Sequence, residues 1–433
     1  MKAGRTPSEG ETRAPLGRLI ESACDAHRWD AHRPTGGDRI SDLKELIQRV
    51  RPHFASAGIT RVAEVTGLDR IGIPVALAVR PNSRSLSVSQ GKGALKDEAF
   101  ISAAMEALEL ATAERLPEGL KWASLAEMTQ AGAPVMALDI STRCRLDRLN
   151  RSQTLAWVQG YDLTADCVVN VPWSLVGADY RPDPPGFHAA FQVSTDGLAS
   201  GFDFRQAIVH GLCELIERDA SALLELMSTA ELSKRVTRIG AADGSDALQF
   251  EQRIRAAGCD LTLLDMTSDI GVPAITAIVT DSAMANAPRV PRYAHSAGAA
   301  CHASRGQAIV KAIAEAAQSR ITRITGSRDD LFPEMYQEAE GAERKAIVEL
   351  LAFIDPTIPA APARPAPDLG GGIRALVALL QKRGIEQVIA VPLKNDFGIS
   401  VVRMIVPGLQ TELTGPRSKL GVRALATLIG RLH

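Results

Sequence analysis

The order of hydrophobic and polar positions repeats at three places in the chain, in residues 51–80, 251–280 and 378–408. Each copy begins with the pattern of an amphipathic helix, which ends at a glycine. Two apolar strand patterns rich in β-branched residues follow, separated by a polar turn with a second glycine. The helix-ending glycines are Gly58, Gly258 and Gly384, and the turn glycines are Gly72, Gly271 and Gly398. Because glycine adopts left-handed conformations at little cost, the pattern predicts an α/β fold of repeated helix–strand–turn–strand units.

Three further segments, at about residues 97–115, 203–227 and 304–325, have the pattern of helices that are apolar on most sides. A core helix of this kind has to match its few polar side chains with partners inside the protein or with a ligand. These polar side chains follow helical spacing, so each set forms one stripe. The stripes are Ser102, Glu106 and Glu109; Gln206, His210, Glu214 and Glu217; and Lys311, Glu315, Gln318 and Thr322, with Arg320 and Arg328 nearby.

The paired glutamates on the first two helices indicate a site for divalent cations. Carboxylates that face one another in a protein interior repel and take up protons unless cations separate them. Mg²⁺ binds a few carboxylate oxygens together with substrate phosphates, and nearby Arg and Lys side chains could neutralise a γ-phosphate. The predicted metal ligands are Glu106, Glu109, Glu214 and Glu217. Glutamates at this spacing also occur on solvated or salt-bridged helix faces, and His210 is interpreted as a core histidine that pairs with Glu214.

Other nucleotide-binding patterns are absent from the sequence. Residues 85–93, SLSVSQGKG, end in a glycine–lysine loop without the spacing of a P-loop, and no G-x-G-x-x-G follows a strand pattern. The residues alone therefore indicate an α/β protein whose glutamate-lined helices suit Mg²⁺ and a nucleotide.

Composition and charge limit the classes of binding partner and the cellular compartment that can be expected. The 433 residues are 45% hydrophobic and 23% charged, with a formal net charge of −1, so no surface for nucleic acid is expected. No apolar run approaches the roughly 18 residues of a membrane span. The six cysteines lack metal or disulfide spacing, which is typical of free thiols in a reducing cytoplasm. Residues 1–38 are interpreted as a flexible tail, and the Pro/Ala-rich residues 354–372 as an internal linker.

Several long segments resemble the YcaO family. They are GITRVAEVTGLDRIGIPVALAVRPNSRSLSVSQGKG, SAAMEALE, GLASG, HGLCELIERDA and EAAQSRITRITGSRDD, which together span about residues 39–408. The resemblance implies a YcaO-like α/β fold, with residues 39–433 as one YcaO domain and core helices lining an ATP/Mg²⁺ site. YcaO proteins phosphorylate a backbone amide oxygen with ATP. Attack by a neighbouring Cys, Ser or Thr side chain then gives an azoline, whereas attack by external sulfide gives a thioamide.

The resemblance also assigns residues to the nucleotide site. It places Ser102, Glu106 and Glu109 in a first ATP/Mg²⁺ motif, and Glu214, Glu217 and Arg218 in a second. It further matches Arg320 and Arg39 to phosphate-contacting positions.

Two positions depart from the family pattern. Phe202 stands where the family usually has Asn, and Gln206 stands where it has a Glu that helps to hold magnesium. Gln206 can still offer a carbonyl oxygen to the cofactor, but its missing charge should weaken Mg²⁺ binding.

The C-terminal sequence favours one YcaO subtype. The chain ends in ATLIGRLH, without the proline-rich tail common in azoline-forming members, and VVRMIVPGLQ followed by GVRALA resembles stand-alone YcaO proteins encoded beside a TfuA partner. This implies thioamide formation in a ribosomally made peptide or protein, with a TfuA-like protein and a sulfide source. A separate leader-peptide-binding protein and a homodimer are expected. Two alternatives remain open: an azoline-forming cyclodehydratase, and a degenerate non-catalytic subunit that supports a partner enzyme.

Overall fold

The computed structural model of the chain describes residues 16–20, 23, 37–285, 294–337, 360–362, 364, 366–370, 372–411, 413 and 419–430, without the side chains of 37–42 and 285. The chain divides into two compact units. Unit 1 comprises residues 1–32, 112–215 and 368–423, and unit 2 comprises residues 33–111, 216–367 and 424–433. Most of the expected tail, residues 1–38, and about half of the expected linker, residues 354–372, lie outside the described residues, and both stay predictions.

The first sheet of unit 2 is antiparallel, with the order β1-β2-β3. Its strands are β1 (Arg61–Glu64), β2 (Val75–Val79) and β3 (Val88–Lys92). The helix α2 (Gly37–Val50) precedes this sheet, with the 3-10 turns η1 (Arg51–His53) and η2 (Thr66–Leu68) before and after β1. The helix α3 (Lys96–Ala113) follows β3, and its last two residues belong to unit 1.

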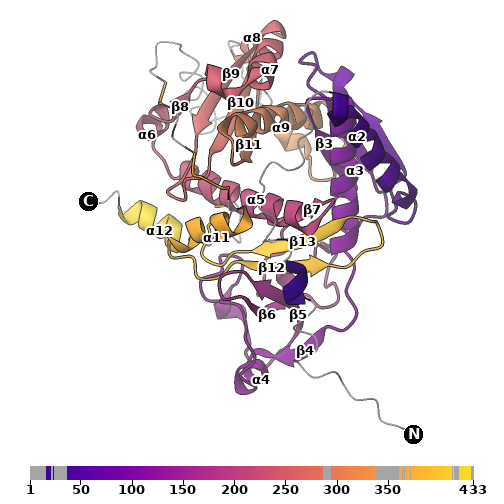
Figure 1. The fold of residues 1–433 in the computed structure, drawn as a ribbon, viewed down its shortest axis with the longest axis vertical. Helices are drawn as coiled ribbons and strands as arrows, with labels where there is room; N and C mark the ends of the chain where they lie inside the picture. Colours follow the sequence, from indigo (N-terminus) through magenta and orange to yellow (C-terminus); the bar gives the residue numbers. More distant parts are fainter. Residues whose placement is uncertain are drawn as a thin grey trace. The chain divides into compact units, whose positions relative to one another are not determined.

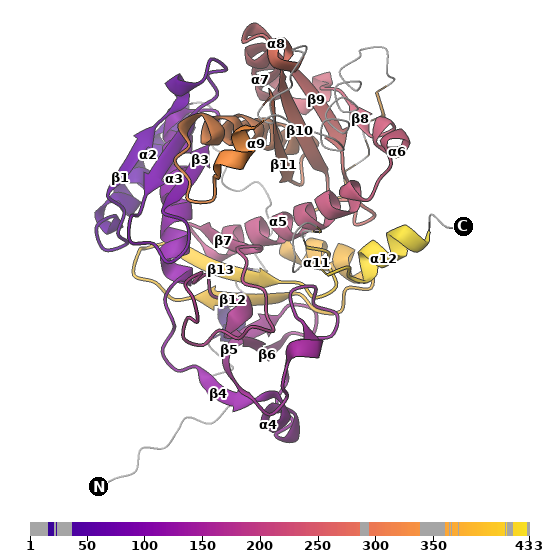
Figure 2. The same cartoon turned by 180° about the vertical axis from the view of Figure 1, so that it is seen from behind.

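The second sheet of unit 2 is also antiparallel, with the order β11-β10-β9-β8. Its strands are β8 (Val236–Thr237), β9 (Cys259–Asp265), β10 (Ala274–Asp281) and β11 (His295–Cys301). The helices α7 (Ser245–Ala256) and α9 (Arg305–Thr325) form one buried apolar cluster with it, and α9 lies along β10 and β11 (Figure 2). Shorter elements are α6 (Thr229–Ser233), η5 (Ala241–Asp243), α8 (Ser282–Ala285) and η7 (Pro333–Tyr336).

Unit 1 contains one antiparallel sheet, with the order β4-β5-β12-β13-β7 and with β6 also paired to β5. Its strands are β4 (Lys121–Ser124), β5 (Thr154–Asp162), β6 (Cys167–Pro172), β7 (Leu198–Gly201), β12 (Ile389–Leu393) and β13 (Ser400–Ile405). Its helices and turns include α4 (Leu125–Gln130), η3 (Leu146–Arg148), η4 (Trp173–Leu175) and α11 (Ile373–Gln381). Two helices begin in unit 1 and end in unit 2, α5 (Phe204–Glu225) and α12 (Val422–Ile429).

The three predicted strand–turn–strand patterns are present, and each proves to be part of a larger unit. In the first copy the helix ends earlier than predicted, because α2 ends at Val50 and the 3-10 turn η1 follows it before Gly58. The hairpins β1–β2, β9–β10 and β12–β13 are antiparallel, as the pattern predicts. A third strand joins each hairpin and leads directly into a long helix: β3 into α3, β11 into α9, and β7 into α5. In Figure 1, β7 lies beside β13, although it comes about 200 residues earlier in the chain. The three predicted core helices are therefore the same element in three copies of one arrangement.

The predicted helix-ending and turn glycines all have positive φ, from 66° to 90°. Two further glycines allow a strand to approach the helix that follows it. A Cβ at Gly91 of β3 would lie 2.1 Å from Ala103 N, and a Cβ at Gly298 of β11 would lie 2.3 Å from Ala316 N. Because backbone atoms cannot move aside as a flexible side chain can, only glycine fits at these two positions.

No helix in the described parts of the chain is long and apolar enough to cross a membrane. The described cysteines are free thiols, as predicted, and all but one are buried; Cys167, at the start of β6, is exposed.

The close approach at Gly298 makes a prediction about stability. Gly298→Ala should destabilise the fold by about 3 kcal/mol or more, because the new Cβ overlaps the backbone of α9. Chemical denaturation measures the change. Gly67→Ala is the matched control, because nothing lies within 4 Å of its added Cβ and its φ is not positive; equal stabilities for the two variants would contradict the prediction.

Candidate functional site

The side chain of Lys92, at the end of β3, is close to carboxylates from three helices. Its Nζ forms an ion pair with Oε2 of Glu315 on α9. Burial alone would lower the pKa of the Lys92 ammonium, but the attraction of the Glu315, Glu217 and Glu106 carboxylates outweighs burial and raises it. Lys92 therefore stays charged, and it is one cation shared among three acids.

The positive charge of Lys92 is not enough to keep the pKa of Glu106, on α3, at its usual value. Burial raises the pKa of Glu106 to about 7, against the opposing effects of Lys92, Arg328 and the backbone N–H of Gln90, and repulsion from Glu315 adds to it. Glu106 is therefore partly protonated near neutral pH unless a further cation lies beside it. A divalent cation would supply that charge.

Two backbone N–H groups from the sheets of unit 2 hold these acids in place. The N–H of Gln90 in β3 donates to Glu106. The N–H of Cys301, at the end of β11, donates to Oε2 of Glu217 at 3.2 Å. Both strands lie at the edge of their sheet, where such N–H groups have no neighbouring strand to bind. The repeated strand-to-helix arrangement thus also provides donors for the carboxylates.

The predicted polar stripe of α9 faces β3. Gln90 Oε1 accepts hydrogen bonds from Thr322 Oγ1 and, at 3.4 Å, from Gln318 Nε2. Gln90 Nε2 and Gln318 Oε1 are buried and have no hydrogen-bond partner among the described residues. A buried amide donor and acceptor normally find a partner, either water or a ligand.

Arg320 has protein partners in the structure. Its Nε lies 3.0 and 3.1 Å from the two carboxylate oxygens of Asp69, and its Nη2 lies 3.4 Å from Asp281. Arg70 pairs with the same Asp281 at 2.7 Å. Contact of Arg320 with a phosphate stays a prediction.

Glu214 and Gln206 lie in unit 1, on the first half of α5. Oε2 of Glu214 accepts a hydrogen bond from the N–H of Gly197 at 3.2 Å. The Gln206 carbonyl oxygen accepts from the N–H of Phe202 at 2.9 Å, while Asp203 accepts from the N–H of Gln206 at 2.7 Å. This pair of bonds satisfies N–H groups at the start of the helix, as a capping box does. Gln206 therefore has a structural role, and its role toward a cofactor stays a prediction.

The remaining predicted residues are placed as follows. Ser102 and Glu109 lie on α3, partly buried, and Arg218 is exposed on α5. His210 is also exposed, so its interpretation as a core histidine is wrong. Helical spacing does not tell how far solvent reaches along a face of the helix. The side chain of Arg39, in α2, lies outside the described residues.

The donor set of the site fits Mg²⁺ with ATP. Among the described residues, no group of three or more His, Cys, Asp or Glu side chains is arranged to hold a metal ion. Mg²⁺ does not require such a cage, because it usually binds one or two carboxylates together with waters and phosphate oxygens. The Glu106 carboxylate, with Lys92 and Arg328 near it, matches that requirement.

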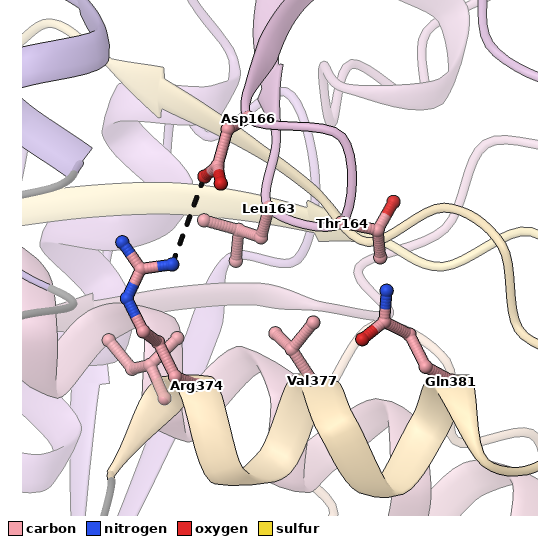
Figure 3. Close-up of a pocket in the computed structure, with 7 residues that line it drawn as sticks. Leu163, Thr164, Asp166, Arg374, Val377 and Gln381 are labelled. Atoms are coloured by element: carbon pink, nitrogen blue, oxygen red, sulfur yellow. Dashed lines mark ion pairs between the residues drawn. The ribbon is translucent and has the colours of Figure 1, made fainter.

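One pocket of unit 1 is separate from these residues. It has a volume of about 230 Å³, and α11 and the β5–β6 turn line it (Figure 3). The ion pair Asp166–Arg374, at 3.9 Å, spans it. Its lining includes none of the predicted site residues.

Sequence reasoning missed Lys92 and left Arg328 without a specific role. Lys92 lies in the glycine–lysine segment that lacks P-loop spacing. Arg328 donates two hydrogen bonds to the carboxylate of Asp330, which are the main reason that the pKa of Arg328 is raised, and it also acts electrostatically on Glu106. A search for isolated cations near glutamate-bearing helices, rather than for a P-loop, could have found both.

Comparison with known proteins identifies the family. The family model described as YcaO cyclodehydratase, ATP- and Mg²⁺-binding, matches residues 90–410. An uncharacterized protein from the tfuA 3′ region of Rhizobium leguminosarum bv. trifolii is 42% identical, over 91% of this chain and 93% of that protein. An uncharacterized protein of Methanothermobacter thermautotrophicus is 33% identical, over 86% of this chain and 95% of that protein.

Solved structures agree with the predicted fold. YcaO from Methanopyrus kandleri, bound with AMPPCP and Mg²⁺, has a TM-score of 0.62 and 21% identity, over 86% of this chain and 91% of that one. A heterocyclase in complex with substrate and cofactor has a TM-score of 0.65 and 19% identity, over 91% of this chain but only 56% of that one. The predicted YcaO-like α/β fold is confirmed, and ATP and Mg²⁺ are the cofactors that the family assigns. The chain belongs to the YcaO cyclodehydratase family.

Proposed function

We propose that the chain uses Mg²⁺-bound ATP to phosphorylate a backbone amide oxygen in a ribosomally made peptide or protein, and that the product is a thioamide. The observation that carries this proposal is the set of carboxylates around Lys92, in which the raised pKa of Glu106, about 7, favours a bound divalent cation such as Mg²⁺. In the first step the amide oxygen attacks the γ-phosphorus of ATP and ADP leaves. In the second, sulfide attacks the amide carbon, phosphate leaves with the original oxygen, and loss of a proton gives the thioamide.

The proposed roles follow from charge. Glu106, Glu109, Glu214 and Glu217 would hold Mg²⁺, which would offset phosphate charge as it develops. Lys92 and Arg328 would stabilise the transferring phosphoryl group, and the positioned carboxylates would fix its orientation. Ser102, Gln206, Arg218, Arg320 and Arg39 would complete the nucleotide site, as the YcaO resemblance implies.

The relative from the tfuA 3′ region supports a TfuA-like partner that takes part in sulfide delivery. The peptide substrate would be presented by a separate leader-peptide-binding protein, and the chain would act as a homodimer in the cytoplasm. A second candidate is azoline formation, because the family model is described as a cyclodehydratase and a similar structure is a heterocyclase. The third, a non-catalytic subunit, is favoured by the local capping role of Gln206.

Glu217→Gln should weaken Mg²⁺-dependent binding of AMPPCP by more than about 10-fold. The amide can still accept the Cys301 N–H, so the fold should be kept, whereas the charge is lost. Equilibrium dialysis with labelled nucleotide measures binding. Glu251→Gln is the control, because Glu251 pairs with Arg255 on α7 and has no place in the site. Wild-type binding by Glu217→Gln would remove this residue from the metal site.

Glu106→Gln should stabilise the protein in the absence of nucleotide and metal while weakening Mg²⁺-dependent binding. The pKa of Glu106 is raised from its usual 4.5 to about 7, so the folded state binds more protons than the unfolded state between these values. Stability is therefore lost as pH rises from about 4.5 to 7, and it stays lower above 7. The variant should gain roughly 1–3 kcal/mol at pH 8 and almost nothing at pH 4.5. Denaturation at both pH values measures this, and a gain that does not depend on pH would contradict the explanation.

The product distinguishes the candidate reactions. With ATP, Mg²⁺, a TfuA-like protein, sulfide and the precursor peptide, mass spectrometry should detect replacement of one oxygen by sulfur. Loss of one water from the peptide would instead favour azoline formation. Product formation only when a second, intact YcaO protein is added would favour the supporting-subunit role.

A further inference from the structure

Arg403 of β13 is fully buried in unit 1 and binds mainly backbone. Its Nε donates to the carbonyl of Val176 at 3.0 Å, and its Nη1 donates to the carbonyl of Asp196 at 2.8 Å. Its Nη2 has no hydrogen-bond partner among the described residues. Burial, with repulsion from Arg143, lowers the pKa of Arg403 to about 10. A buried guanidinium with no carboxylate hydrogen-bonded to it is costly for a fold, so a role that offsets this cost is expected.

The peptide group that Arg403 binds also holds Glu214. The carbonyl of Asp196 accepts from Arg403, and the N–H of the next residue, Gly197, donates to Oε2 of Glu214 at 3.2 Å. This peptide bond is trans, so its carbonyl oxygen and its N–H point in opposite directions from one rigid plane. Arg403 and Glu214 therefore bind the two sides of a single planar group.

Gly197 is fixed by further contacts. Its carbonyl accepts from the N–H of Met404 at 2.7 Å, and its φ is +74°. A Cβ at this position would lie 2.3 Å from the carbonyl oxygen of Met404. Gly197 therefore cannot shift without breaking its pairing with β13. Because the Asp196–Gly197 peptide is one rigid plane, the orientation that Arg403 gives to its carbonyl also sets the direction of the Gly197 N–H.

We propose that Arg403 is a positioning residue for the Mg²⁺-nucleotide site, acting on Glu214 through the Asp196–Gly197 peptide. Its positive charge polarises that peptide, which makes the Gly197 N–H a stronger donor to the carboxylate. A guanidinium suits this role because its planar fork reaches two carbonyls at once, whereas a lysine ammonium has no such fork. The inference rests on the proposed function, since it takes Glu214 as a ligand of Mg²⁺.

The test measures how binding of AMPPCP by the full chain depends on Mg²⁺ concentration, with calorimetric titration. Arg403→Met should raise the Mg²⁺ concentration for half-maximal binding by about 10- to 100-fold, the range for partners that orient metal ligands. Arg403→Lys should give an intermediate shift, and it serves in place of the Met variant if that variant fails to fold. In a Glu214→Gln background, either substitution should add less than about twofold, because the residue it acts through is already changed.

Arg143→Met is the matched control. Arg143 is also buried, and it donates through Nε and Nη2 to the carbonyl of Gln192, at 3.2 and 3.1 Å, rather than to the Asp196–Gly197 peptide. Because Arg143 does not bind the Asp196–Gly197 peptide, Arg143→Met should lower the melting temperature while leaving the Mg²⁺ concentration for half-maximal binding close to that of wild type. A purely structural role of Arg403 would give the same result for both arginines.

The outcomes separate the two proposals. If the wild-type chain binds AMPPCP without any dependence on Mg²⁺, or does not bind it, the proposed function is wrong, and the role of Arg403 is wrong as well. If the wild type shows Mg²⁺-dependent binding and the Arg403 variants bind identically, or their effects add fully to that of Glu214→Gln, only the role of Arg403 is overturned.

Discussion

The site depends on the electrostatic attraction between the Lys92 ammonium and the carboxylates around it. This ammonium is the cation in contact with Glu315, and it also attracts Glu217 and Glu106. Lys92 and Arg328 together do not offset the burial of Glu106, whose pKa is raised to about 7. The protein thus keeps an electrostatically unfavourable carboxylate at Glu106, which a bound divalent cation such as Mg²⁺ would stabilise.

The repeated architecture explains how these carboxylates can be held in place. Each third strand leads into a long helix, and glycines such as Gly91 and Gly298 let the strand lie against the helix backbone. Edge N–H groups in β3 and β11 then bind the carboxylates of Glu106 and Glu217. The same close packing therefore fixes the helices and supplies hydrogen bonds to their acids, so the acids do not have to be positioned by mobile loops.

Local sequence patterns predicted those parts of the fold and site that depend on residues close together in the sequence. Helical spacing identified the helices that carry Glu106 and Glu217, and the glycines marked the hairpins. Pairing of β7 with β13 could not be predicted, because periodicity contains no information on which distant strands meet. Lys92 was missed since its role depends on contacts from three helices, and Arg403 lies in an otherwise apolar strand pattern, where its burial is set by the tertiary fold.

In the proposed function, carboxylates of α3 and α5 bind the metal of a nucleotide complex. A crystal structure of the chain with AMPPCP and Mn²⁺, which favours the same oxygen ligands as Mg²⁺, tests it most directly. We expect anomalous-scattering peaks in contact with both the nucleotide phosphates and carboxylates from the set Glu106, Glu109, Glu214 and Glu217. Nucleotide and metal bound elsewhere, or metal held without any of these four carboxylates, would contradict it.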